Sequence, residues 1–379
     1  MKYRTMGKTG VRSSVFGLGC MRFNGEASGD SIIDEQKAIS LIRRAIDGGV
    51  TYMDTAYVYL DKTSEVVLGK ALQDGYRDKV TIATKMPMEA VHNREEMQAL
   101  LDLELEKLQT DHIDFYLMHG IDRESWDYFK SIGAPEFFDD MKKEGKIRWK
   151  CFSFHGPYEE FEYILKDSDW DMVQIQYNFM DIENQAGTKG LELAAGMNIP
   201  VVIMEGLLGG RLAKAPSNVQ ALYDSFPEKR SPVEWAFRWL CDHPEVSVVL
   251  SGCNEEEQID DNLRIFDSVE AGVMSDDELK LIADVRDAYN SRTRIGCTDC
   301  RYCMPCPNGV NIPGVFKIWN NMALYEVKPQ TVFEYGNIME TGSGADKCIG
   351  CGACESACPQ HLSIIDELKN AWAEITAEK

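Results

Sequence analysis

Eight cysteines near the end of the chain stand in two runs of four, and their spacing suits metal chemistry. The runs are Cys297, Cys300, Cys303 and Cys306, and Cys348, Cys351, Cys354 and Cys358. The second run has the spacing Cys-x-x-Cys-x-x-Cys-x-x-x-Cys-Pro, in which three thiolates from one tight loop and a fourth before a proline hold 4Fe-4S clusters. The first run is one residue shorter before Cys306. Structural zinc is the weaker interpretation, because it usually uses two separated Cys-x-x-Cys pairs.

The composition limits the class of protein and its partners. The 379 residues, 44% of them hydrophobic, can bury one large core and a small second domain. A net charge of −22 argues against nucleic acid or an anionic membrane as a partner, because both would repel the chain. No signal-like start and no apolar run near the ~18 residues of a membrane span is evident. We therefore expect a cytoplasmic protein, in which clustered cysteines bind metal rather than form disulfides.

Short apolar runs alternate with amphipathic segments over most of the chain. The predicted strands cover residues 15–18, 51–53, 80–84, 113–117, 147–152, 172–175, 201–204 and 246–250. The predicted helices cover residues 34–47, 64–72, 94–108, 135–143, 158–165, 187–196 and 232–241. This alternation predicts an α/β fold, a (β/α)8 TIM barrel over residues 1–290, with a hairpin over residues 2–14 across its floor. An open doubly wound sheet is the alternative, but it would normally carry a Gly-x-Gly-x-x-Gly turn after its first strand.

Polar residues that directly follow the predicted strands can meet at one rim, because chemistry in a barrel lies at the C-terminal ends of its strands. Asp54 follows the second strand, and a phenol, that of Tyr57 or of Tyr59, lies in the loop after it. Lys85 and His119 follow the third and fourth strands. A lysine ammonium lowers the pKa of a neighbouring phenol, and a carboxylate paired to the lysine holds it in place. We therefore predict a site in which the phenol protonates an oxygen while a hydride reaches the attached carbon.

The sequence around these residues resembles the aldo-keto reductases over about residues 1–290. The similarity rests on the runs GVTYMDTAYVY, IATKMP, DFYLMHG and QIQYN. It implies a catalytic tetrad of Asp54, Tyr59, Lys85 and His119, and a nicotinamide dinucleotide that is bound in an extended pose. It also implies carboxamide contacts, a pyrophosphate loop over residues 207–212 and an adenosine end over residues 251–262. The implied cofactor residues are Ser153, Gln174, Met204, Leu207, Gly209, Arg211, Ser251, Gly252, Gln258 and Asn262.

One departure from the family pattern concerns the choice of cofactor. Family members that prefer NADPH usually carry basic residues at the positions held here by Gly252 and Gln258. Three glutamates, residues 255–257, lie between these positions. A 2′-phosphate would meet carboxylates without a cation to pair with, so the resemblance favours NADH and leaves NADPH open.

The tail, residues 291–379, resembles a small, mainly helical ferredoxin-type iron–sulfur domain. The resemblance implies two 4Fe-4S clusters that exchange their fourth ligands, with one cluster as the alternative because the first run is short. The implied ligand sets are Cys297, Cys300, Cys303 and Cys358 for one cluster, and Cys348, Cys351, Cys354 and Cys306 for the other. Between the runs we expect a helix over residues 312–326 and a loop, and after them a closing helix over residues 362–377.

Two functions fit these observations. The first is an aldo-keto reductase-type NAD(P)-dependent oxidoreductase that reduces a carbonyl or related small-molecule substrate, with Tyr59 as the general acid. The second is an electron-transfer protein whose clusters exchange single electrons with a redox partner protein or a bound flavin. A hydride carries two electrons together and a cluster moves one, and a flavin, for which the sequence has no signature, usually joins the two. A barrel that only senses nicotinamide is disfavoured, because a sensor need not keep all four groups of the tetrad.

Overall fold

The structure is a computed structural model, and it describes residues 1–23 and 34–377. Contacts within the chain define two compact units. The first is Met1–Gly209 with Val233–Leu279, and the second is Gly210–Pro232 with Lys280–Lys379. The contacts therefore group Gly210–Pro232 with the cysteine-bearing segment rather than with the strands. The boundary expected at residue 290 stays a prediction.

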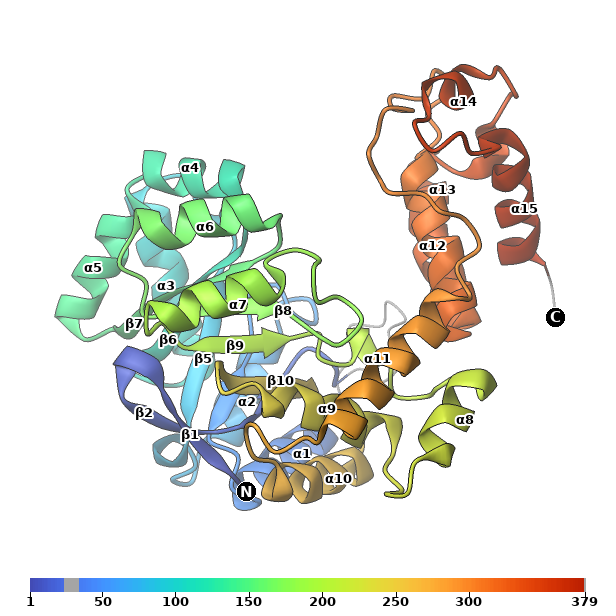
Figure 1. Cartoon of the computed structure of the whole chain (residues 1–379). Helices are drawn as coiled ribbons and strands as arrows, with labels where there is room; N and C mark the ends of the chain where they lie inside the picture. Colours follow the sequence, from blue (N-terminus) through green and yellow to red (C-terminus); the bar gives the residue numbers. More distant parts are fainter. Residues whose placement is uncertain (24–33, 378–379) are drawn as a thin grey trace. The chain divides into compact units, whose positions relative to one another are not determined.

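The first unit is a closed barrel of eight parallel strands, in the order β10-β3-β4-β5-β6-β7-β8-β9 (Figure 1). The strands are β3 (Phe16–Gly19), β4 (Tyr52–Asp54), β5 (Thr81–Met86), β6 (Ile113–Ile121), β7 (Ile147–Phe154), β8 (Met172–Gln176), β9 (Val201–Met204) and β10 (Val246–Gly252). Parallel pairing of β10 with β3 closes the ring. This confirms the predicted (β/α)8 barrel, and the alternative of an open sheet is wrong.

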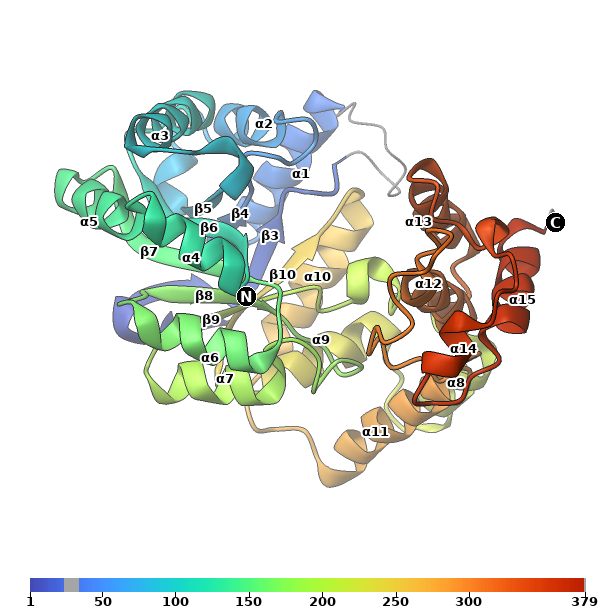
Figure 2. The same cartoon turned by 90° about the horizontal axis from the view of Figure 1, so that it is seen from above.

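Helices surround the barrel strands, as Figure 2 shows from above. They are α1 (Glu35–Asp47), α2 (Ser64–Ala71), α3 (Arg94–Leu108), α4 (Arg123–Ser131), α5 (Ala134–Glu144), α6 (Tyr158–Asp167), α7 (Gly187–Gly196), α9 (Pro232–Asp242) and α10 (Glu256–Ser268). Side-chain caps explain several helix starts: Asn93 Oδ1 accepts from the Glu96 amide at 3.0 Å, and Asp122 forms a capping box with Ser125. Helix α4 is an addition to the helices predicted from the sequence.

A hairpin of β1 (Tyr3–Met6) and β2 (Val11–Ser14) packs against one end of the barrel. The buried side chain of Met6 joins a cluster of barrel-interior side chains that includes Tyr52, Phe115 and Met172. The predicted hairpin across the barrel floor is therefore present. Because Met6 and its neighbours fill this end of the barrel, catalytic residues are expected at the opposite rim.

The second unit is helical. Its helices are α8 (Ser217–Ser225), most of α11 (Asp276–Asn290), α12 (Ile312–Tyr325), α13 (Lys328–Glu340), α14 (Ala353–Ala357) and α15 (Ile364–Thr376). A core of α12 and α15 side chains, among them Phe316, Trp319 and Leu368, packs against several of the cysteines. The expected helix between the two cysteine runs is present as α12, but the expected loop after it contains α13. None of the helices in residues 1–23 and 34–377 is long and apolar enough to cross a bilayer.

Candidate active site and iron–sulfur ligands

The ends of β4 and β5 bring together the buried ion pair at the centre of the barrel site. Lys85 Nζ lies 2.8 Å from Asp54 Oδ1 and 2.9 Å from Oδ2, and it donates to the Thr55 carbonyl oxygen at 2.7 Å. The Lys85 side chain is 1% exposed and the Asp54 side chain 4% exposed. The two strands are neighbours, with Asp54 paired to Ala83. All three donors of the ammonium are therefore directed at oxygen atoms within the protein.

Tyr59 and His119 lie against this ion pair. Lys85 Nζ is 4.9 Å from the centroid of the Tyr59 ring. The Tyr59 and His119 rings meet edge to face, with centroids 5.9 Å apart and planes at 78°. Tyr59 follows a turn in which its amide donates to the Ala56 carbonyl at 3.1 Å. The structure thus brings together all four residues that the sequence proposed as a tetrad.

Burial is the largest single influence on the pKa values of Tyr59 and its neighbours. It raises the pKa of Tyr59 more strongly than the Lys85 ammonium lowers it. Burial, together with Lys85 and His155, lowers the pKa of His119 to about 3. Burial also lowers the pKa of Lys85, but the attraction of Asp54 and Tyr59 raises it further. At neutral pH the site therefore holds a protonated phenol, a neutral imidazole and an ammonium.

The prediction from the sequence that Lys85 lowers the pKa of Tyr59 was incomplete. Lys85 does act in the predicted direction on the pKa of Tyr59, but it does not overcome burial. The cost of charging a phenol away from water is a three-dimensional property, and a strand pattern does not reveal it.

A second layer of hydrogen bonds, which the sequence analysis missed, fixes the loop that carries Tyr59. Ser64, the first residue of α2, donates to the Cys20 carbonyl at 2.8 Å and lies 2.9 Å from Thr55 Oγ1. The next residue, Glu65, is fully buried and accepts from Thr84 Oγ1 at 2.6 Å. These contacts join the start of α2 to β4 and β5, so they hold both ends of the segment between Asp54 and α2.

The ends of β7, β8 and β9 carry residues that suit a carboxamide. Ser153 Oγ accepts from the Gly120 amide at 2.7 Å. Gln174 Nε2 lies 3.6 Å from Met204 Sδ, and Gln174 Oε1 is buried without a hydrogen-bond partner in the part of the chain that the structure describes. A buried amide oxygen without a partner costs free energy unless a donor reaches it. The amide donor of a nicotinamide would satisfy this oxygen, so these residues fit the cofactor that the sequence implied.

The end of β10 and the start of α10 hold the residues implied for the adenosine end. Asn262 Nδ2 lies 3.1 Å from both Ser251 Oγ and Cys253 Sγ, and therefore fixes the loop after the strand. Gln258 Oε1 accepts from the Asn254 amide at 2.9 Å. Gly252 is exposed at the strand end.

Two of the three glutamates in this region already have cations. Glu255 pairs with Lys37 at 2.6 Å, and Glu256 pairs with Arg44 at 3.4 Å. The sequence argument treated these carboxylates as unneutralised, so it overstated the negative charge that a 2′-phosphate would meet.

The remaining cofactor residues divide between the two units. Leu207 and Gly209 follow β9 in the barrel unit, and Arg211 belongs to the second unit, where it pairs with Glu334 of α13. Arg22, which the sequence analysis did not single out, lies against Gly209 and Gly252. Arg22 follows β3 in the chain, so only closure of the barrel brings it to the loops after β9 and β10.

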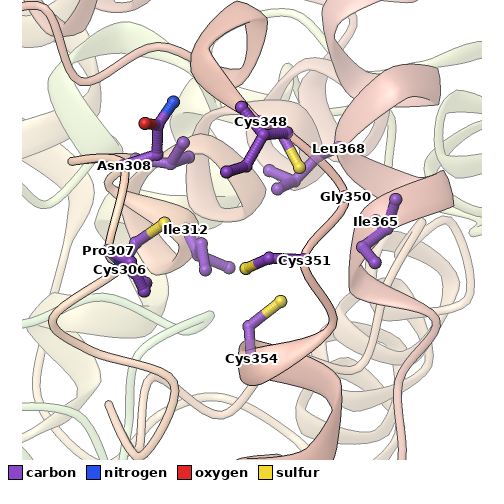
Figure 3. Close-up of a pocket in the computed structure, with 12 residues that line it drawn as sticks. Cys306, Pro307, Asn308, Ile312, Cys348, Gly350, Cys351, Cys354, Ile365 and Leu368 are labelled. Atoms are coloured by element: carbon purple, nitrogen blue, oxygen red, sulfur yellow. The ribbon is translucent and has the colours of Figure 1, made fainter.

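The cysteines gather into two sets that cross the sequence runs. Cys306, Cys348, Cys351 and Cys354 line one pocket together with Ile312 and Leu368, and Figure 3 shows their sulfur atoms directed into a shared space. Cys297, Cys300, Cys303 and Cys358 line a second pocket with Phe316 and Ile364. In each pocket, four thiol side chains surround an opening beside apolar side chains. This donor set fits a 4Fe-4S cube, in which each thiolate binds a different iron.

The comparisons with known proteins agree with a barrel followed by an iron–sulfur domain. Residues 15–287 match the family model described as "Aldo/keto reductase family", which covers most of the chain. The chain belongs to the aldo/keto reductase family. Residues 296–363 match the model of a 4Fe-4S dicluster domain. This aldo/keto reductase therefore joins the barrel of its family to a 4Fe-4S domain in one chain.

Relatives of this aldo/keto reductase align with the barrel part of the chain. The "Uncharacterized oxidoreductase YrpG" of Bacillus subtilis is 26% identical over 309 residues, which are 70% of this chain and 90% of the relative. The solved "aldo-keto reductase AKR11C1 from Bacillus halodurans (holo form)" has a TM-score of 0.63 at 25% identity and covers 75% of this chain and 96% of its own. An aldo-keto reductase from Klebsiella pneumoniae, solved in complex with NADPH, has a similar fold, with a TM-score of 0.60 and 22% identity. The match covers 76% of this chain and 96% of that protein.

Proposed function

We propose that this aldo/keto reductase reduces the carbonyl group of a small-molecule substrate with a nicotinamide cofactor, and that Tyr59 is the general acid. The observation that carries the proposal is the buried Lys85–Asp54 pair beside the Tyr59 ring. An ion pair so deeply buried is seldom a gain in stability over an apolar pair. A barrel rim that keeps it next to a phenol and a neutral histidine is arranged for proton transfer.

The residues of the barrel supply the proton and the orientation. The bound dihydronicotinamide supplies a hydride to the carbonyl carbon. Tyr59 donates its phenolic proton to the carbonyl oxygen, so the substrate gains one hydride and one proton and becomes an alcohol. Lys85 stabilises the phenolate that remains, and Asp54 keeps Lys85 charged and in position. Neutral His119 donates a hydrogen bond that orients the carbonyl oxygen, because its low pKa leaves it uncharged.

The cofactor is held, in this proposal, by residues at the ends of β7 to β10. Gln174 and Ser153 bind the carboxamide, Met204 lies against the ring, and Leu207 and Gly209 line the pyrophosphate. Ser251, Gly252, Gln258 and Asn262 surround the adenosine end. NADH is expected to bind at least as tightly as NADPH, because none of the residues that the sequence singled out at the adenosine end is basic.

A cofactor-oxidation assay tests this function. The anaerobic protein is mixed with NADH or NADPH and a panel of aldehydes and ketones, and the nicotinamide absorbance and the alcohol product are followed together. We expect one alcohol formed for each dinucleotide oxidised with at least one substrate class. If neither dinucleotide binds to the protein in a fluorescence titration, the proposal is wrong.

A second function, single-electron transfer, is supported by the exposure of the cysteine sites. We propose two 4Fe-4S clusters, held by the two sets of four cysteines, which supply one electron each when reduced. Cys300 in one set and Cys351 in the other are exposed. Each set therefore has an edge at the surface of its own unit, where a redox partner protein can approach.

This second function is tested without any assumption about the barrel. The protein is reduced anaerobically with dithionite, freed of excess reductant and mixed with a one-electron dye. Re-oxidation of the clusters within seconds, seen as a return of their visible absorbance, is the expected result. Clusters that stay reduced in the presence of the dye would leave them a structural role.

A further inference from the structure

Arg22 occupies space that two glycines leave open. A Cβ atom added to Gly252 would lie 2.7 Å from Arg22 Cγ and 3.1 Å from Arg22 Cβ, so the stem of the arginine crosses the position of a side chain at 252. A Cβ atom added to Gly209 would lie 3.2 Å from Arg22 Nη2, so the guanidinium reaches the loop after β9. Gly209 has φ +65°, a conformation that favours glycine. The side chain of Arg22 therefore bridges the loops after β9 and β10.

The charge of Arg22 is not neutralised by the carboxylates described around it. In residues 1–23 and 34–377, no ion pair joins Arg22 to an aspartate or glutamate, whereas nearby Glu255 and Glu256 pair with Lys37 and Arg44. A guanidinium stays charged at any physiological pH and presents five N–H donors. Arg22 is thus a half-buried cation beside Gly209, whose backbone is exposed. Such a cation suits a dianion such as a pyrophosphate.

We propose that Arg22 binds the pyrophosphate of the nicotinamide dinucleotide. This inference rests on the proposed function, and it adds a binding residue that neither the family resemblance nor the sequence pattern assigned. The pyrophosphate is favoured over the 2′-phosphate because Nη2 lies at Gly209, in the loop after β9, and not at Gln258 in α10. The glycine at 252 is then required, because a larger residue would displace the arginine.

The test is a set of dissociation constants for the full protein with its clusters, measured anaerobically for NADH, NADPH and ADP-ribose. Arg22→Gln removes the charge, and Arg22→Lys keeps it. Lys37→Gln is the matched control, because it removes a cation of the same region that already has a carboxylate partner. Circular dichroism and the visible spectrum of the clusters check that each variant is folded.

We expect Arg22→Gln to weaken all three ligands by a similar factor of about 10 to 100, the range for a charge-assisted hydrogen bond. Arg22→Lys should recover part of that loss, and Lys37→Gln should bind NADH and ADP-ribose, which lack the 2′-phosphate, like the unaltered protein. A loss confined to NADPH would overturn the assignment to the pyrophosphate, and unchanged constants for Arg22→Gln would overturn any contact. If the unaltered protein binds neither dinucleotide, the proposed function is wrong and this inference fails with it. That outcome is seen in the unaltered protein, so it is distinct from any effect of the Arg22 variants.

Discussion

Lys85 and burial have opposite effects on the ionisation of Tyr59. The Lys85 ammonium contacts two carboxylate oxygens and one backbone carbonyl at 2.7 to 2.9 Å. Lys85 lowers the pKa of Tyr59 by its charge and through a side-chain hydrogen bond, and its Nζ lies 4.9 Å from the centroid of the Tyr59 ring. Burial opposes that effect, so the phenol of the cofactor-free protein keeps its proton at neutral pH. The phenol that we propose as the general acid therefore carries its proton before substrate binds.

The titration of Tyr59 gives a prediction at this scale. Because burial raises the pKa of Tyr59, the phenol should ionise above the usual value of about 10 in the cofactor-free protein. Lys85→Met should raise that pKa further, because it removes the influence that lowers it. The measurement is an ultraviolet titration of the unaltered protein minus that of Tyr59→Phe, so that the other tyrosines cancel. A phenol that ionises well below pH 10 would show that Lys85 outweighs burial.

Residue types, spacing and the family resemblance were enough to place the four proposed tetrad residues at one rim, because three of them lie near the ends of β4, β5 and β6 and Tyr59 lies in the loop after β4. They could not reveal Arg22 at Gly209 and Gly252, because that contact exists only once β10 pairs with β3. Nor could they reveal the unpartnered Gln174 oxygen, which depends on what surrounds the end of β8.

At the scale of elements, the strands and most helices followed from hydrophobic periodicity, and two of the helices that were not predicted, α13 and α8, share one property. Helix α13 buries only Thr331 and Tyr335, and α8 buries only Val219 and Tyr223. Two buried residues form too narrow a stripe for a helical period to be recognised. Their helical state is a consequence of tertiary packing, which a single sequence does not display.

The close packing of α2 on α3 gives a second prediction. A Cβ atom on Gly69 of α2 would lie 2.3 Å from the Lys107 carbonyl oxygen and 2.8 Å from the Leu108 carbonyl carbon, so the backbone of one helix would have to move. We expect Gly69→Ala to lower the free energy of unfolding by about 1–3 kcal/mol, although alanine favours a helix by about 1 kcal/mol. The measurement is urea unfolding followed by circular dichroism.

The control for Gly69 is another helical glycine of the barrel unit. Gly196 ends α7 and has no atom within 4 Å of an added Cβ. Gly196→Ala should leave stability unchanged or raise it by up to about 1 kcal/mol. Equal stabilities of the two variants would show that the α2–α3 contact is not close. Since α2 follows Tyr59 and carries Ser64 and Glu65, we also expect Gly69→Ala to lower turnover.

At the scale of the whole molecule, two units with different chemistry share one chain. The crossed cysteine sets make the second unit depend on both of its halves, because each pocket takes three cysteines from one run and the fourth from the other. The resemblance to ferredoxin-type domains implied this exchange of fourth ligands between the two runs. A shared core of α12 and α15 side chains, including Ile312 at both pockets, joins them.

Iron content tests the crossed sets. The unaltered protein should hold about eight irons for two 4Fe-4S clusters. A variant with Cys348, Cys351 and Cys354 all changed to serine should keep one cluster. In that background, adding Cys358→Ser should remove the remaining cluster, and adding Cys306→Ser should not. The reverse pattern would mean that each run binds its own cluster.

The most direct test of the account is the turnover of Tyr59→Phe with saturating cofactor and a carbonyl substrate that the unaltered protein reduces. The substitution removes only the phenolic hydroxyl, so the cofactor should bind within a few-fold of the unaltered protein. Loss of a general acid should lower kcat by about 10²- to 10⁴-fold. A Tyr59→Phe protein that keeps near-normal turnover would contradict the assignment of Tyr59 as the acid and the reductase mechanism built on it.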